Sequence, residues 1–277
     1  MSLSYEKLSQ TPKNFLQLTG LNVIDFNKIA KLVKPAWEQK EKKKKLDGRP
    51  AHLATLKDQL LCLMVYYRTY ITHTFLGHLF NLHNSNISRL FKKLEPMVAK
   101  HVKIKRDADL TSDKVLSLLV DATEQRTQRP KHGQKAFYSG KKKCHTIKTE
   151  IAMEAEGRIV SVSKSHRGSV HDFRIRKAEK PLLQNSIKYA DSGYQGLQKL
   201  QQNVTLPFKH TKNSKLTTEQ KTHNRLLSQI RVKVEHKIRE IKIFQIIGGK
   251  YRNFQKKHNM RFGIIAALVN LKCGYQT

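Results

Sequence analysis

Apolar residues in the first hundred positions recur every three or four residues, which is the spacing of amphipathic helices. Asn22 is a typical helix-capping residue, and Val23, Phe26, Ile29 and Val33 follow it on a single helical face. The pattern predicts a helix that buries this face against its neighbours.

A charged stretch and then a helix-breaking one interrupt this pattern. Residues 40–45 are lysines except for Glu41, and residues 47–50 read DGRP. Like charges resist packing, and glycine and proline break helices, so a solvated linker is predicted here. It ends a first segment, residues 1–47, that consists of helix and basic linker.

The second segment, residues 48–108, predicts two short helices joined by a tight turn. The capping pair Thr55 and Asp58 opens a helical run, and a shorter helix follows around residues 75–79. Another helix begins at residue 84 and is expected to end before Pro96. Paired helices of this kind are typical of a helix-turn-helix, whose second helix enters the DNA major groove, although a hairpin that only packs has the same pattern. The candidate DNA contacts at the start of the second helix are Asn84, Ser85, Asn86, Ser88, Arg89, Lys92 and Lys93.

After residue 108 the pattern changes to short strands. Residues 115–120 are an apolar run typical of a buried strand, and the run ends at Asp121. Residues 145–153 and 158–163 alternate polar and apolar side chains around a Glu-Gly turn, as a hairpin does. Residues 188–190 lead into a glycine-rich turn that starts at Asp191.

Helices accompany these strands. Asp172 is expected to start a short helix, and the capping pair Thr217 and Gln220 a long one that ends at residues 248–249. A last apolar helix covers about residues 260–271. This order of elements predicts an α/β domain over residues 109–277.

Charge indicates the class of partner. The chain carries 54 lysines and arginines against 21 acidic residues, a formal net charge of +33. A field of one sign opposes compaction unless a polyanion neutralises it, so nucleic acid is the expected partner. Charge alone does not separate an enzyme from a protein that merely coats nucleic acid.

Other features exclude several classes. The three cysteines lie far apart and form no CxxC pair, so neither a disulfide framework nor a zinc site is expected. The chain has no GxxxxGK loop, no secretory signal and no apolar stretch long enough to cross a bilayer. We therefore expect a cytoplasmic protein with no membrane partner.

Acidic residues are scarce, and three of them stand at positions suited to catalysis. Asp121 and Asp191 each close an apolar strand, and Glu235 lies at the edge of the apolar face of the long helix. Phosphoryl transfer on DNA can use two Mg²⁺ ions, which prefer hard carboxylate oxygens. An alternative for Glu235 is a surface ladder of ion pairs with Arg231 and Arg239, four residues away on either side.

A series of short motifs occurs in a fixed order along the chain. The motifs are VDATE at 120–124, RP at 129–130, YSGKK at 138–142, HTIKT at 145–149, GSVHD at 168–172, ADSGYQG at 190–196, Asn224, RVKVEH at 231–236, and RF at 261–262 through NL at 270–271. Together they resemble the DDE transposases of bacterial insertion sequences, in the group related to eukaryotic Harbinger elements. The resemblance covers about residues 15–275, since residues 18–21 and the helix-turn-helix also look like the family's amino-terminal part.

The resemblance implies an RNase H-like α/β catalytic domain preceded by an all-α helix-turn-helix region. It assigns Asp121, Asp191 and Glu235 as ligands of Mg²⁺ or a substituting Mn²⁺, and it gives Asp172 no catalytic role. It implies cleavage at the transposon ends and attack of the freed 3′-hydroxyl on target DNA. The expected partners are double-stranded DNA, as terminal inverted repeats and target, and a second protomer in a homodimer on DNA. The expected location is the bacterial cytoplasm, in association with the nucleoid.

Further basic residues near the candidate site are expected to contact DNA: Lys141, Lys142, Lys148 and Arg231. For the lysines, the alternative is a solvated hairpin edge that lysines protect from pairing. Two functional alternatives also stand: a transposase-derived nuclease without strand transfer, and a DNA-binding regulator without catalysis.

Overall fold

The computed structural model describes residues 2–43, 51–104, 117–210 and 215–275. The chain forms two compact units, each treated by itself below. The helical unit comprises Met1–Lys103, Ile241–Gly249 and Lys256–Thr277, and the mixed unit Ile104–Glu240 and Lys250–Gln255. Of the predicted linker at residues 40–50, residues 44–50 lie outside the described residues, as does the predicted boundary at residue 108. The linker prediction is wrong for residues 40–42, which form the last turn of a helix, where basic side chains are favourable.

Three helices open the helical unit: α1 (Tyr5–Ser9), α2 (Pro12–Thr19) and α3 (Val23–Lys42). The predicted cap of α3 is confirmed, because Asn22 Oδ1 accepts a hydrogen bond of 2.7 Å from the Asp25 amide. Of the predicted apolar face, Phe26, Ile29 and Val33 are confirmed with no solvent exposure, whereas Val23 in the first turn is only partly buried.

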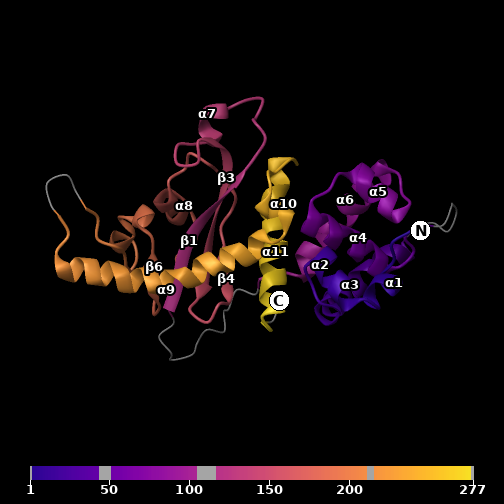
Figure 1. The fold of residues 1–277 in the computed structure, drawn as a ribbon, viewed down its shortest axis with the longest axis horizontal. Coiled ribbons are helices and arrows are strands. Elements are labelled where there is room, and N and C mark those ends of the chain that lie inside the picture. Colours follow the sequence, from indigo (N-terminus) through magenta and orange to yellow (C-terminus); the bar gives the residue numbers. More distant parts are fainter. Residues whose placement is uncertain (1, 44–50, 105–116, 211–214, 276–277) are drawn as a thin grey trace. The chain divides into compact units, whose positions relative to one another are not determined.

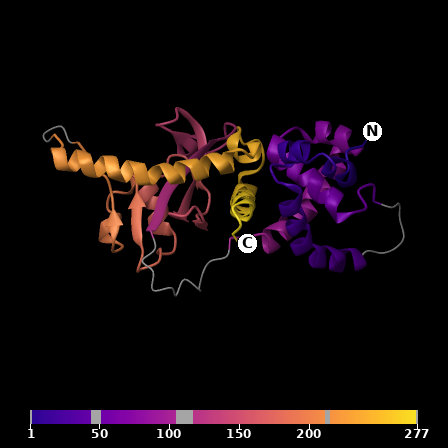
Figure 2. The same ribbon diagram turned by 60° about the horizontal axis from the view of Figure 1, so that its bottom comes forward.

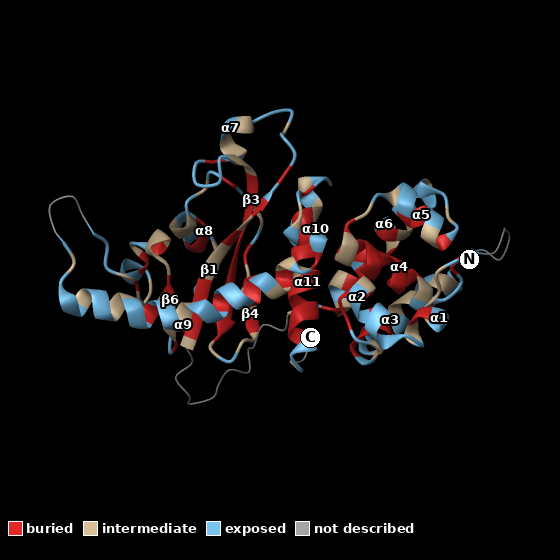
Figure 3. Cartoon of the chain, viewed as in Figure 1, coloured by how far each residue is buried: buried red, intermediate tan, exposed pale blue. Residues whose placement is uncertain are grey.

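The predicted helical pair follows α4 (Leu56–Thr69) and consists of α5 (His73–Phe80) and α6 (Asn84–His101). The Thr55 hydroxyl caps α4 by accepting a hydrogen bond of 3.0 Å from the Asp58 amide, as expected. Asn81 ends α5 in the left-handed conformation, with φ of 50°, and the chain turns there into α6. Figure 3 shows α4 as the most buried helix of this group.

The prediction that α6 ends before Pro96 is wrong. A proline inside a helix removes one backbone hydrogen bond to the carbonyl four residues earlier. That carbonyl belongs to Lys92, which is exposed, as Pro96 is, so water can satisfy it. Met97 and Val98 are buried beyond the proline, and their packing keeps the chain helical to His101.

Two helices from the C-terminal end complete the helical unit: α10 (Gln245–Gly248) and α11 (His258–Lys272). α10 packs on α4, and α11 packs on α6. Residues 264–271 of α11 are all buried, and a helix that is apolar all round needs cover on every side. The mixed unit therefore does not extend over the whole expected α/β range, residues 109–277, because α11 groups with the N-terminal helices. Within the described residues, none of the helices has the length and apolarity needed to cross a membrane.

In the described part of the mixed unit, seven strands form one sheet in the order β2-β3-β1-β6-β7, and β4 and β5 pair with β3. Their bounds are β1 (Ser117–Arg126), β2 (Tyr138–Ser139), β3 (Cys144–Glu154), β4 (Ile159–Val162), β5 (His166–Arg167), β6 (Ile187–Ala190) and β7 (Val204–Thr205). β1 runs antiparallel to β3 and parallel to β6. The predicted hairpin is confirmed as β3 and β4, with Gly157 in the turn at φ of 103°.

The expectation that the first strand ends at Asp121 is wrong. β1 continues to Arg126, and its partner β3 matches it residue by residue as far as Thr146. Antiparallel pairing satisfies the backbone of the polar residues after Asp121, so the strand needs no apolar sequence to persist. Thr123 and Gln125 are buried on one face there. Asp121 thus lies within β1, at the point where its apolar half ends.

The helices of the mixed unit are α7 (Gln134–Phe137), α8 (Asp172–Ala178), η1 (Ser192–Tyr194), η2 (Leu197–Lys199) and α9 (Thr218–Lys242). The short helix η3 (Gln255–Lys257) begins at the last residue of this unit and precedes α11. The predicted capping pair of α9 is confirmed: Thr217 Oγ1 accepts from the Gln220 amide at 3.2 Å, and Gln220 Oε1 accepts from the Thr217 amide at 3.1 Å.

α9 runs along one face of the sheet (Figures 1 and 2). Leu227, Val234 and Ile238 are its buried apolar residues in the mixed unit, as the apolar spacing predicted. The helix ends at Lys242 rather than at residues 248–249, because the chain leaves the helix to bury Phe244 and then forms α10.

Candidate active site and nucleic-acid interface

Two of the predicted carboxylates lie next to each other at the centre of the sheet. β1 and β6 pair in parallel with Val120 opposite Ala190, and the residues that follow this pair are Asp121 and Asp191. Each carboxylate accepts a hydrogen bond from the amide of the following residue, at 2.8 Å for Asp121 and 2.7 Å for Asp191. The shared register therefore places the two aspartates at the same level on two neighbouring central strands.

Burial and negative neighbours act together on this pair. Burial raises the pKa of Asp121 to about 6; nearby Arg231 opposes the rise, and Asp191 and Asp172 add to it. Crowded carboxylates of this kind favour a bound cation, and hard oxygen ligands suit a divalent one such as Mg²⁺. The donor set of Asp121 and Asp191 thus fits the metal that the sequence predicts.

Glu235 does not join the two aspartates in this structure. α9 instead presents Arg231, whose Nη1 lies 3.3 Å from Asp191 Oδ1. Glu235 is exposed one helical turn further along, and it forms no ion pair with any described residue, so the ladder with Arg231 and Arg239 is absent there. Across the described residues, no group of three or more His, Cys, Asp or Glu side chains is arranged to hold a metal ion.

Asp172 starts α8 as expected, but it also belongs to the site. Its Oδ1 lies 2.9 Å from Lys148 Nζ, and its charge acts on Asp121. The sequence alone indicates Asp172 only as a helix-start residue. Its sequence neighbours gave no sign of the ion pair, because the pair forms only when α8 packs on β3.

Lys148 lies inside the mixed unit rather than at an exposed edge. Its side chain is 10% exposed, and its ammonium group lies 3.4 Å from Glu124 Oε1 as well as 2.9 Å from Asp172 Oδ1. It also donates a hydrogen bond of 2.9 Å to the carbonyl of Val170. The contacts of this ammonium group are thus with oxygens inside the unit, and the expected phosphate contact stays a prediction.

A second buried polar group lies close to the aspartates. Glu150 and Arg176 form an ion pair of 2.7 Å in which both side chains are almost fully buried. Burial raises the pKa of Glu150 to about 7 despite the arginine, and it raises that of the neighbouring Tyr194 hydroxyl well above its usual value. These three residues were not candidates from the sequence, because α8 and η1 bring them to β3 only in the folded chain.

The basic block between residues 135 and 143 is largely exposed. Lys141 and Lys142 lie in the turn between β2 and β3, and both are exposed. Beside this turn is a hollow of about 1000 Å³ whose lining includes Arg129, Lys135 and Tyr138. Exposed cations and an exposed ring are compatible with a grip on DNA and also with a solvated sheet edge.

The start of α6 presents most of its polar residues to solvent. Asn84, Asn86, Ser88, Arg89 and Lys92 are exposed, whereas Ser85 and Lys93 are partly buried. The two partly buried residues have internal partners: the Ser85 hydroxyl lies 2.9 Å from His83 Nδ1, and Lys93 forms an ion pair with Glu41.

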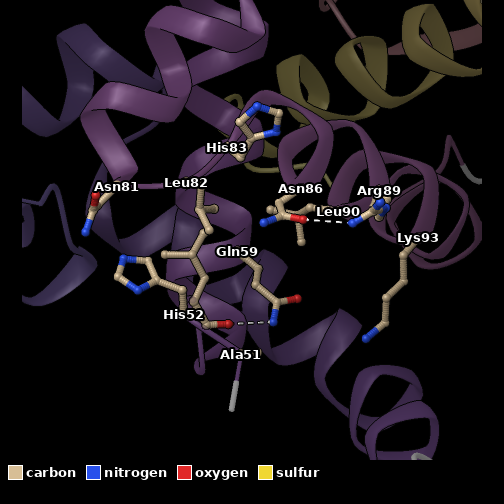
Figure 4. Close-up of a pocket in the computed structure, with 11 residues that line it drawn as sticks. Ala51, His52, Gln59, Asn81, Leu82, His83, Asn86, Arg89, Leu90 and Lys93 are labelled. Carbon is tan, nitrogen blue, oxygen red and sulfur yellow. Dashed lines mark hydrogen bonds between the residues drawn. The ribbon is translucent and has the colours of Figure 1, made fainter. Parts of the chain in front are cut away.

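Asn86, Arg89 and Lys93 line a hollow of about 690 Å³ in the helical unit, opposite the segment that precedes α4 (Figure 4). Arg89 Nη1 donates a hydrogen bond of 3.0 Å to Asn86 Oδ1. Gln59 holds the opposite wall by donating a hydrogen bond of 2.9 Å to the Leu53 carbonyl. The amide and guanidinium groups thus meet at a concave surface where base edges or phosphates could dock.

Comparison with known proteins gives two family matches and two similar transposases. Residues 120–270 match the DDE superfamily endonuclease family, and residues 51–104 match the helix-turn-helix of DDE superfamily endonucleases. The chain is 33% identical over 274 residues to the probable transposase for insertion sequence element IS702 of Microchaete diplosiphon, a match that covers 97% of this chain and 98% of that protein. It is 25% identical over 257 residues to the putative transposase for insertion sequence element IS112 of Streptomyces albus G, covering 91% and 93%. No solved structure matches the chain.

Proposed function

Because this chain belongs to the DDE superfamily of endonucleases and to the transposases of insertion sequences, we propose that it cleaves the ends of its own element and joins the freed 3′-hydroxyl to target DNA. Its fold agrees with that family: a helix-turn-helix region precedes an RNase H-like α/β domain. The parallel register that places Asp121 beside Asp191 is the observation that carries the proposal.

Asp121 and Asp191 would hold the divalent ions, and Glu235 would be the third ligand. Bound Mg²⁺, or Mn²⁺ in its place, stabilises the attacking and leaving oxygens of a phosphoryl transfer. Glu235 follows Arg231 by four residues, so both side chains lie on one stripe of α9, and Arg231 already contacts Asp191. That shared stripe supports Glu235 as the residue that approaches the aspartates when a metal binds.

The helical unit would recognise the terminal inverted repeats. Arg89 and Asn86 have the donor and acceptor groups that read base edges in the major groove, and exposed Lys92 suits a phosphate. Lys141 and Lys142 would hold phosphates near the catalytic domain, and Arg231 would hold one at the aspartates. Two protomers on DNA would pair the two ends of the element, in the cytoplasm of a bacterium and on its nucleoid.

Cleavage of a labelled duplex that ends in the element's inverted repeat tests the proposal. With Mg²⁺ or Mn²⁺ the wild type is expected to nick the end, and Asp121→Asn to lose at least about 100-fold in rate while still binding the duplex. Glu235→Gln tests the third ligand: cleavage by this variant at the wild-type rate would show that Glu235 is not a metal ligand.

A pre-cut end separates the functional alternatives. The transposase joins such an end to target DNA, whereas a nuclease without strand transfer cuts the inverted repeat and gives no joined product. Binding without any cleavage, under both metals, would favour the regulator.

A further inference from the structure

The first turn of α8 packs against the turn that carries Asp191. An added Cβ on Gly193 would lie 2.7 Å from Asp172 Oδ2, closer than such atoms approach. At Gly196, where φ is 98°, an added Cβ would lie 3.2 Å from the ring of Phe173. Two consecutive residues of α8, Asp172 and Phe173, thus lie against the two glycines of the turn that begins at Asp191.

Lys148 keeps Asp172 in this place. Its ammonium group binds Asp172 Oδ1 at 2.9 Å, while Asp172 Oδ2 is the atom that faces Gly193. Lys148 stands on β3 directly opposite Glu124 of β1, and it lies 3.4 Å from that carboxylate. The contact therefore connects the Asp191 turn, through Asp172 and Lys148, to the strand that carries Asp121.

We propose that Asp172, held by Lys148, is a positioning residue that fixes the Asp191 turn relative to Asp121. One carboxylate oxygen pairs with Lys148 while the other faces Gly193, so moving the carboxylate away from Gly193 would disturb its ion pair. It is not proposed as a metal ligand. The inference rests on the proposed function, since that function makes Asp121 and Asp191 the residues whose spacing matters.

Asp172 also adds negative charge near the two aspartates, and it is among the neighbours that raise the pKa of Asp121. Position and charge can be separated by substitution. Asp172→Asn keeps the shape and an oxygen that can accept from Lys148, whereas Asp172→Ala removes the carboxylate entirely. In Asp172→Ala the remaining Cβ would be 3.5 Å from a Cβ at position 193, an ordinary contact.

This geometry allows a double-substitution test with the full chain. Two quantities are measured for Asp172→Ala, Gly193→Ala and the double variant. One is the affinity for Mn²⁺ without DNA, monitored by electron paramagnetic resonance, and the other is the rate of end cleavage. Each single variant is expected to lose about 10- to 100-fold in Mn²⁺ affinity, the usual loss when a residue supporting a metal ligand is removed. The double variant is expected to be no weaker than Asp172→Ala, because alanine at position 193 then meets no carboxylate.

The conservative variant separates positioning from mere folding. Asp172→Asn is expected to retain more Mn²⁺ affinity than Asp172→Ala at equal thermal stability. Wild-type Mn²⁺ affinity and cleavage in Asp172→Ala would overturn the inference. The inference would also be overturned if Gly193→Ala lowered Mn²⁺ affinity by the same factor with aspartate and with alanine at position 172.

Failure of the proposed function gives a different result. A wild type that neither cleaves the repeat nor binds Mn²⁺ refutes that function. The coupling between the two substitutions in thermal unfolding then still measures the contact itself, and additive losses there would refute the contact.

Discussion

Glu95 of α6 and Arg261 of α11 form a buried ion pair although 166 positions separate them. Arg261 Nε and Nη2 both lie 2.7 Å from Glu95 Oε1, and the two side chains are 0% and 3% exposed. Lys257 lies 3.3 Å from the other carboxylate oxygen but is itself 34% exposed. The C-terminal helix is thus tied to the helix that carries the candidate DNA contacts.

Arg261→Met is expected to lower the free energy of unfolding of the helical unit by about 3–5 kcal/mol, because Glu95 stays buried without its main partner. Denaturant unfolding followed by circular dichroism measures the loss. Lys257→Met is the matched control and should cost less than about 1 kcal/mol, since Lys257 is 34% exposed and Glu95 keeps its pair with Arg261. Combining Glu95→Gln with Arg261→Met should recover part of the loss; equal stability of Arg261→Met and wild type would contradict the prediction.

The burial of His258, in the first turn of α11, makes the stability of the helical unit depend on pH. Burial lowers the pKa of this histidine to about 4, and nearby Arg261 acts in the same direction. An unfolded histidine titrates near pH 6.5, so the unfolded chain binds more protons between pH 6.5 and 4. The stability contribution is complete above pH 6.5 and falls by about 3 kcal/mol as the pH drops through this window.

The measurement is the difference in unfolding free energy between wild type and His258→Asn from pH 7 to pH 4. The asparagine does not titrate, so the difference should shift by about 3 kcal/mol in favour of the variant as the pH falls. A difference that stays constant over this range would show that His258 is not buried in its neutral form.

Arg89 and Lys92 of α6 are expected to contribute to DNA binding in different ways. Arg89→Ala should cost about 1–3 kcal/mol on the inverted repeat and little on unrelated DNA, because a base contact discriminates between sequences. Lys92→Ala should weaken both equally and reduce the slope of affinity against salt by about one. Fluorescence anisotropy at several salt concentrations distinguishes them, and an equal loss on both DNAs for Arg89→Ala would refute base readout.

Lys148→Met distinguishes the internal role of this lysine from the phosphate contact that the sequence suggests. The structure predicts a loss of about 3–5 kcal/mol in unfolding free energy, because Asp172 and Glu124 are left as neighbouring carboxylates without a cation. Affinity for DNA should stay close to that of wild type. Lower DNA affinity at unchanged stability would instead support the phosphate contact. Lys142→Met, exposed in the β2–β3 turn, is the control for loss of charge alone.

Several features of this protein follow from local sequence. The caps Asn22, Thr55 and Thr217 each bind amides within three residues, so their chemistry is complete in a short stretch of chain. The apolar runs before Asp121 and Asp191 likewise predict buried strands without knowledge of their neighbours. Family motifs added the pairing of these aspartates, and the register of β1 and β6 agrees with it.

Tertiary structure decided what depends on distant partners. β1 persists past Asp121 because β3 pairs with it, and α6 persists past Pro96 because buried residues beyond the proline hold it. Lys148 lies between Asp172 and Glu124 only once α8 and β1 have both packed on β3. In the same way α11 joins the N-terminal helices through Arg261 and Glu95. A local pattern determines which backbone conformation a segment prefers, whereas the partner of a buried charge is set by whichever opposite charge the folded chain brings within a few ångströms.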